Sequence, residues 1–173
     1  MVLTESIVLP SNEELNIQEI NLTFSVLQAA AFHLGKYCES NNNEFMLCKS
    51  EEPDPRRCID EGKSVTACAL EFFKKIKKHC NEEFDQYYTC LEKSSGNSAF
   101  SPCRKTQSVF DQCVLDNLEI ERPDFGYFCQ VKIHNTQRPK PKSSIPVFPD
   151  APVPITIEEP LPTPKYNSRR IYF

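Results

Sequence analysis

The sequence lacks a long apolar run, and it has no excess of positive charge. It contains no stretch of about 18 consecutive apolar residues, so we expect no membrane-spanning helix. Residues 1–10 lack a basic start followed by an apolar core, and they lack arginine. This argues against a secretory signal and against a mitochondrial presequence. The formal net charge of −4 argues against nucleic acid as the main partner.

Glycine is scarce, with four residues, whereas proline is common, with fourteen, nine of them between Pro139 and Pro164. Closely spaced prolines exclude long helices and central strands, so residues 121–173 are predicted to form an extended Pro-rich tail. The apolar residues between these prolines suggest that the tail orders along a larger surface. The front of the chain is predicted to fold into small units, which usually need covalent cross-links.

Cysteine is abundant and regularly spaced. Eight of the nine cysteines form four copies of one motif, in which nine residues separate two cysteines. Ten residues of helix rise about 15 Å, so two antiparallel helices can join outer cysteine to outer and inner to inner. Eight cysteines could pair in 105 ways, and this geometry selects one. The predicted disulfides are Cys38–Cys68 with Cys48–Cys58 in the first hairpin, and Cys80–Cys113 with Cys90–Cys103 in the second.

A large apolar residue follows the first cysteine of each motif by seven positions and precedes the second by three. On a helix such a residue shares the face of the cysteine, so each disulfide is expected to pack against it. These packing and docking candidates are Phe45, Val65, Tyr87 and Phe110.

Four regions are predicted. Residues 1–37 form a helical arm, with Ser11 and Glu14 as a capping box and Gly35 as a stop, which packs on the hairpins or on a partner. Residues 38–70 form the first hairpin and residues 80–115 the second. The fold class is therefore mainly α, with two tandem disulfide-linked antiparallel helical hairpins, the N-terminal arm and the extended tail.

Local sequence features predict where the helices of the hairpins begin and end. Asn41–Asn43 are poor helix formers, so the regular helix of the first hairpin is expected to span about residues 43–50. Asp54 as cap with Pro55 at the first helical position predicts the start of its second helix. Asn81 is expected to cap the next helix, and Ser101 with Pro102 to begin the last.

Other cysteine chemistries fit less well. Reduced core cysteines would not keep a fixed interval, zinc ligands usually lie two to four residues apart within a pair, and a catalytic thiol would want a nearby cysteine or histidine partner. His79 adjoins Cys80 but points away from it, and His33 and His134 are isolated, so surface or packing roles are expected for the histidines. No metal, cofactor or catalytic residue is predicted.

Two features stay open. Cys129 lies outside the motifs and is either a buried free thiol or part of an intermolecular disulfide. The lysine cluster is either a solvated helix end or a contact for anionic lipid headgroups; it consists of Lys74, Lys75, Lys77 and Lys78.

The cysteine spacing over residues 38–113 resembles that of the coiled-coil-helix–coiled-coil-helix (CHCH) family of the mitochondrial intermembrane space. Two hairpins in tandem, Glu-Phe-Met-Leu-Cys at 44–48, Asp-Pro-Arg-Arg-Cys at 54–58 and a Pro-rich C-terminus resemble accessory subunits of respiratory complex I, NADH:ubiquinone oxidoreductase.

The resemblance implies import without a cleaved presequence and oxidation by the disulfide relay of the intermembrane space. Phe45, Phe84, Tyr87 and Phe110 are candidate docking faces for that relay. It further implies a non-catalytic subunit on the intermembrane-space face of the membrane arm, peripheral to the inner membrane, which supports assembly and stability through contacts with other complex I subunits. No family role transfers to Cys129.

Two alternative functions remain. A metallochaperone or assembly factor would want a free cysteine pair beyond the disulfides. An oxidoreductase of the relay would need an exposed, reducible cysteine pair. Neither pair is evident in the sequence.

Overall fold

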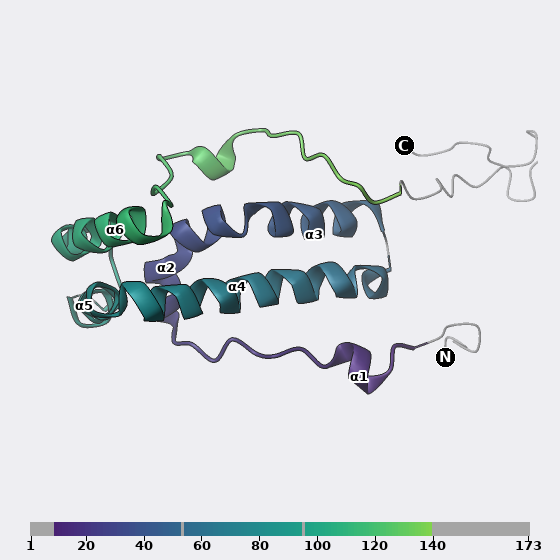
Figure 1. The fold of residues 1–173 in the computed structure, drawn as a ribbon, viewed down its shortest axis with the longest axis horizontal. Coiled ribbons are helices and arrows are strands. Elements are labelled where there is room, and N and C mark those ends of the chain that lie inside the picture. The colour runs from purple at the N-terminus through teal and green to yellow at the C-terminus, as the bar shows by residue number, and fades with distance from the viewer. Residues whose placement is uncertain (1–8, 53, 95, 140–173) are drawn as a thin grey trace, which may run out of the picture. The chain divides into compact units, whose positions relative to one another are not determined.

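The computed structural model describes residues 9–52, 54–94 and 96–139. These belong to one compact unit, Met1–Pro141; the second unit, Lys142–Phe173, lies outside the described residues, and with it most of the predicted Pro-rich tail. The elements of the described part are helices, without a strand among them (Figure 1). The predicted fold class, two tandem disulfide-linked hairpins in a mainly α chain, is confirmed.

The N-terminal arm contains one short helix and one long helix. α1 spans Asn12–Leu15 and carries the predicted capping box: Glu14 N donates to Ser11 Oγ at 3.2 Å, and Ser11 N donates to Glu14 Oε2 at 2.9 Å. α2 spans Phe24–Tyr37. The described part of the arm thus contains two helices, as a helical arm predicts, and the segment between them has no regular structure. α1 buries no residue, and a helix gains most of its stability from packing, so nothing extends it.

Gly35 does not stop α2, contrary to the prediction. The helix continues to Tyr37, and Gly35 instead allows a close approach from another segment. A β-carbon added at Gly35 would lie 3.0 Å from Cζ of Phe128. The glycine is therefore explained by tertiary packing and not by a helix end.

The first hairpin consists of α3, Glu39–Glu51, a short 3₁₀ turn, η1, Pro55–Cys58, and α4, Ile59–His79. Asp54 caps η1 by accepting from Arg56 N at 3.1 Å, and Pro55 is the first residue of the turn, as predicted. The expectation that regular helix begins near residue 43 is wrong, because the asparagine run is helical. Asn41 Nδ2 donates to Ser64 O of α4 at 3.2 Å, so tertiary contact outweighs the low helix propensity of asparagine.

The second hairpin consists of α5, Asn81–Ser94, a 3₁₀ turn, η2, Ser101–Cys103, and α6, Arg104–Leu118. Only Cys80 separates α4 from α5, so Asn81 is the first helical residue and not the residue before the helix. Glu82 and Glu83 in the first turn of α5 suit the positive end of the helix dipole.

The hydrophobic core lies where α2 and the second half of α4 meet the second hairpin. Tyr87 of α5 and Phe110 of α6 are fully buried and stack at 5.9 Å between ring centroids. Phe72 and Ile76 of α4 join them, and burying a side chain of this size contributes about 1.5–3 kcal/mol. Ala29 and Ala30 place α2 on this core, so the arm packs on the hairpins as expected.

α3 contributes no residue to this core. The first hairpin therefore depends more on its cross-links than the second does. Figure 1 shows α3 and the first part of α4 running side by side, away from the core. Among the described helices, none is both long and apolar enough to cross a membrane.

Candidate functional site: a cross-linked double hairpin with a clasp

Four disulfides tie the helices together. They join Cys38 to Cys68 and Cys48 to Cys58 in the first hairpin, and Cys80 to Cys113 and Cys90 to Cys103 in the second. The Cα–Cα distances are 5.9–6.0 Å, within the usual range for disulfides. Each hairpin is thus held at two levels, about three helical turns apart.

The four apolar candidates divide into two pairs. Tyr87 and Phe110 lie in the core of the second hairpin with 0% exposure. Phe45 and Val65 of the first hairpin are half-buried, and Phe45 contacts the position of Gly62 on α4. In the folded chain only the first-hairpin pair retains accessible surface, so a docking role for Tyr87 and Phe110 would require the unfolded chain that precedes oxidation.

The chain turns back sharply after α6. Glu119 adopts a left-handed conformation, with φ of 57°, and ends the helix. Arg122 then pairs with Asp111 of α6 at 3.2 Å, and its guanidinium lies 4.3 Å from the ring centroid of Phe32 on α2. These contacts direct the following chain onto the surface of α2 and α3.

Residues 127–138, which we call the clasp, lie along α3 (Figure 1). At its start, Tyr127 OH donates to Glu39 Oε2 at 2.7 Å and accepts from Lys36. Lys132 donates to Glu39 Oε1 at 2.5 Å, with its Nζ 3.3 Å from the centroid of the Tyr127 ring. The hydrogen bond from Lys132 is the main reason that the pKa of Glu39 lies below its usual value.

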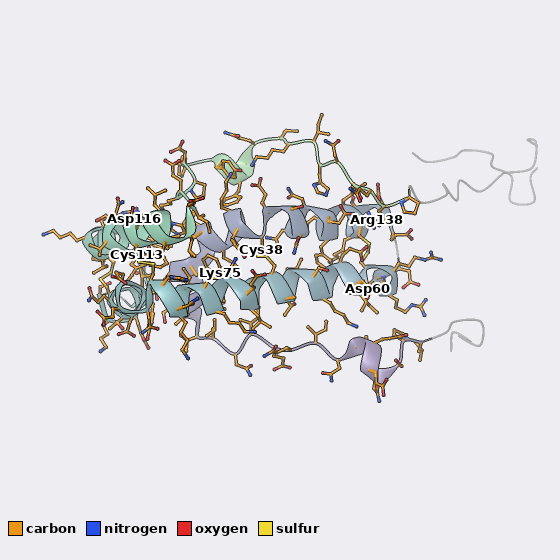
Figure 2. All side chains as sticks on the ribbon, in the orientation of Figure 1. Cys38, Asp60, Lys75, Cys113, Asp116 and Arg138 are labelled. Atoms are coloured by element: carbon orange, nitrogen blue, oxygen red, sulfur yellow. A yellow bond between two sulfur atoms is a disulfide. The ribbon has the colours of Figure 1, made fainter. Side chains whose placement is uncertain are left out.

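Farther along, the clasp contacts two more acids of α3. Glu44 accepts from Thr136 Oγ1 at 2.6 Å, and its other oxygen lies 2.6 Å from Nε2 of His134. These two hydrogen bonds lower the pKa of Glu44. Arg138 donates to Glu51 Oε2 at 2.8 Å, and Figure 2 shows it beside the end of α3.

The spacing of the clasp matches the helix beneath it. From Lys132 to Arg138 an extended chain advances about 20 Å, and from Glu39 to Glu51 an α-helix rises about 18 Å. Basic and hydroxyl side chains of the clasp therefore stay opposite successive acids of α3. In the sequence, apolar and polar residues alternate only over 131–134, which is a weak signal for this contact.

His33 is fully buried between α2 and α6. Its Nε2 lies 3.4 Å from Asp111 Oδ1, and its ring packs edge-on against Phe110. Burial lowers its pKa to about 4, and the nearby Asp111 offsets this only in part. The predicted packing role therefore fits His33. His134 is not isolated as predicted, because it contacts Glu44.

Cys129 is exposed and outside the four disulfides, so the expectation of a buried thiol is wrong. Lys75 pairs with Glu71 at 2.9 Å, so a lipid contact by the lysine cluster would rest on its other three members. Within the described ranges, no group of three or more His, Cys, Asp or Glu side chains could hold a metal ion.

Double cross-links between antiparallel helices, joined through cysteines spaced ten apart, define a CHCH protein. The model of the CHCH domain matches residues 80–116, the second hairpin.

Three relatives match a longer part of the chain than the CHCH domain model does. The "NADH-ubiquinone oxidoreductase 20.8 kDa subunit" of Neurospora crassa is 34% identical over 108 residues, 61% of this chain and 58% of the relative. In Arabidopsis thaliana, "NADH dehydrogenase [ubiquinone] 1 alpha subcomplex subunit 8-B" is 37% identical over 90 residues, 52% of this chain and 83% of the relative. Subunit 8-A is 36% identical over 90 residues. The chain spans less than two thirds of the length of the fungal relative. On its match to the two plant proteins, this chain belongs to the family of subunit 8 of the NADH dehydrogenase [ubiquinone] 1 alpha subcomplex.

Proposed function

We propose that this chain is a non-catalytic accessory subunit of mitochondrial complex I, where it supports assembly and stability of the membrane arm from the intermembrane-space face. The family membership carries the proposal, because the named relatives are subunits of NADH–ubiquinone oxidoreductase. In this role the double hairpin is a rigid body that presents fixed surfaces to neighbouring subunits.

The disulfides support the proposed compartment. Disulfides are rare where glutathione keeps thiols reduced, and four of them in one unit call for an oxidising compartment. The intermembrane space, with its disulfide relay, meets this need. Of the four docking candidates, Phe45 and Val65 beside the cysteines of the first hairpin keep accessible surface in the folded chain. They are therefore the proposed docking residues of the folded protein.

The test is removal of the protein from mitochondria of its own organism. We expect the chain to migrate with NADH dehydrogenase activity on native gels, and its loss to lower the amount of assembled complex. Re-expression of the full chain should restore assembly. Normal complex in its absence, or migration of the chain away from the activity, would contradict the proposal.

Location is tested separately. With intact inner membranes and ruptured outer membranes, added protease should degrade the chain, while matrix proteins stay protected. Extraction at alkaline pH should release it if its attachment to the membrane is peripheral.

The alternative of a metallochaperone receives little support from the site. Eight of the nine cysteines are in disulfides, which leaves one thiol, on Cys129, in place of the pair that such a role would want. Stoichiometric binding of Cu(I) by the oxidised chain would revive it.

A further inference from the structure

The clasp presents opposite chemistry on its two sides. Side chains at alternate positions from Lys132 to Arg138 face α3 and bind its acids. The residues between them face away, with Val131 at 102% and Ile133 at 91% exposure. An ordinary amphipathic strand would bury its apolar side and expose its charges, so this segment is inverted.

Charges on the inner side are balanced within the chain. Lys132 pairs with Glu39, and Arg138 pairs with both Glu44 and Glu51. The outward side chains carry no charge: they are Val131, Ile133, Asn135 and Gln137. The outward face of the clasp is therefore neutral and partly apolar, which favours an uncharged partner over a charged one.

The main-chain N–H and C=O groups of the clasp indicate which class of partner can bind there. Between Val131 and Gln137, the described residues provide no main-chain hydrogen bond. Covering this edge with lipid would bury main-chain donors and acceptors without partners, which is strongly unfavourable. A polypeptide in extended conformation can satisfy them by pairing as a strand beside the clasp, and its side chains on the outward face then lie next to Val131 and Ile133.

The chain's own tail is poorly suited to that position. Up to Pro164 it has at most five consecutive residues without proline, and each proline lacks the N–H that a strand ladder needs. Its one longer run without proline, residues 165–173, carries Lys165, Arg169 and Arg170 and does not match a neutral surface. Another polypeptide can supply an uninterrupted strand.

We propose that the main chain of the clasp, residues 131–137, is a docking edge beside which an extended, uncharged segment of a neighbouring polypeptide pairs as a β-strand. That the neighbour is a complex I subunit follows from the proposed function. The docking edge itself is argued independently of that function. β-Branched residues at 131 and 133 favour the extended conformation on this edge.

Photo-crosslinking in mitochondria tests this edge. Benzoylphenylalanine is introduced singly at Val131, Ile133 and Asn135, with Val109 of α6, itself 53% exposed, as the control position. We expect the three clasp probes to crosslink to one partner polypeptide at sites that step by two residues, as strand pairing requires. We expect no crosslink to that segment from Val109.

Each other outcome overturns the proposal: crosslinks to lipid alone, to residues 140–173 of the same chain alone, to scattered sites without the two-residue step, or none. Migration of the chain with NADH dehydrogenase activity is measured on the same samples. Strand-like crosslinks in a chain that does not migrate with the activity would retain the docking edge and reject the proposed function.

A charge-insertion pair provides an independent readout. V131K/I133K should reduce the yield of the partner crosslink from Asn135 about tenfold, because lysines on the edge of a sheet oppose pairing. V109K/L115K adds the same charge to exposed apolar positions of α6 and should leave that yield unchanged. Mapping of the four disulfides confirms that both variants are folded. Equal yields from the two variants would overturn the proposal.

Discussion

The ring of Phe128 lies against the backbone of Gly35, so closely that a β-carbon at Gly35 would meet Cζ of Phe128 at 3.0 Å. This contact joins the start of the clasp to the last turns of α2. It is flanked by the interaction of Tyr127 with Lys36 and Glu39, so the attachment of the clasp combines packing with charge.

Gly35→Ala should therefore loosen the clasp without weakening the fold. Alanine raises helix stability by up to about 1 kcal/mol over glycine, but its methyl group displaces the Phe128 ring. We expect faster amide hydrogen exchange in residues 127–138 and unchanged or higher resistance of the helices to denaturant.

Gly62→Ala is the matched control for that substitution. Gly62 is also helical, and a β-carbon there would meet the Phe45 ring at an ordinary 3.4 Å. It should gain the same helix propensity and leave exchange in the clasp unchanged. Equal effects of the two alanines on the clasp would show that the Phe128 contact does not hold it.

The hairpins could be predicted from the sequence because a covalent constraint produces a periodic pattern. Cysteines repeated every ten residues can form disulfides between antiparallel helices in one simple pairing. This constraint outweighs the local helix propensity of the residues between them. The asparagine run shows this: Asn41 forms helix because the disulfides and Ser64 hold it there.

The clasp could not be predicted in the same way. Its contacts join residues such as Glu44 and Thr136 that are far apart in the sequence, and no local pattern states which acid meets which base. Gly35 was misinterpreted for the same reason, since the ring that explains it lies on a different segment. Local rules describe helix ends well only where no distant residue intervenes.

Removing the disulfides should affect the two hairpins unequally. Each disulfide contributes about 3–4 kcal/mol by restricting the unfolded chain, but only the second hairpin also has the aromatic core around Tyr87. Replacing Cys38, Cys48, Cys58 and Cys68 by alanine should unfold α3 and the facing part of α4, seen as a loss of helical circular dichroism and of amide protection there.

The corresponding replacement of Cys80, Cys90, Cys103 and Cys113 should lower stability while retaining native helix content in buffer. If both quadruple variants lost their helices to the same extent, the aromatic core would not be compensating for the missing cross-links.

Buried His33 should make stability depend on pH. Because its pKa is lowered to about 4 by burial, the unfolded chain binds the proton first as pH falls below 6.5. The stability that comes from keeping His33 buried and neutral is fully present above pH 6.5 and is lost progressively toward pH 4. Between pH 7.5 and 5 we expect the free energy of unfolding to fall by about 2 kcal/mol on this account.

Denaturant titrations of the oxidised protein at these two pH values, with His33→Leu alongside, measure the effect. The leucine variant should lose most of the difference between the two pH values. Asp111 and Arg122 face His33 and remain in both proteins. An unchanged pH dependence in the variant would mean that His33 is not the group responsible.

The clasp should open in acid. The hydrogen bonds from Thr136 and His134 lower the pKa of Glu44 from its usual 4.5, and that from Lys132 does the same for Glu39. Attachment is therefore complete above pH 4.5 and is lost as pH falls through the lowered values. Glu44→Gln should weaken attachment already at neutral pH, and trypsin should cut after Lys132 about two to five times faster, as expected for loss of one exposed ion pair.

Glu92→Gln, at an exposed position of α5, is the control and should leave the cleavage rate unchanged. The methyl resonance of Thr136, followed by NMR from pH 7 to 3, reports the acid transition directly, because this residue touches the titrating carboxylate. In the wild type its shift should change below pH 4.5, and in Glu44→Gln that change should shrink. A Thr136 signal that moves equally in both proteins would show that Glu44 does not control the attachment of the clasp.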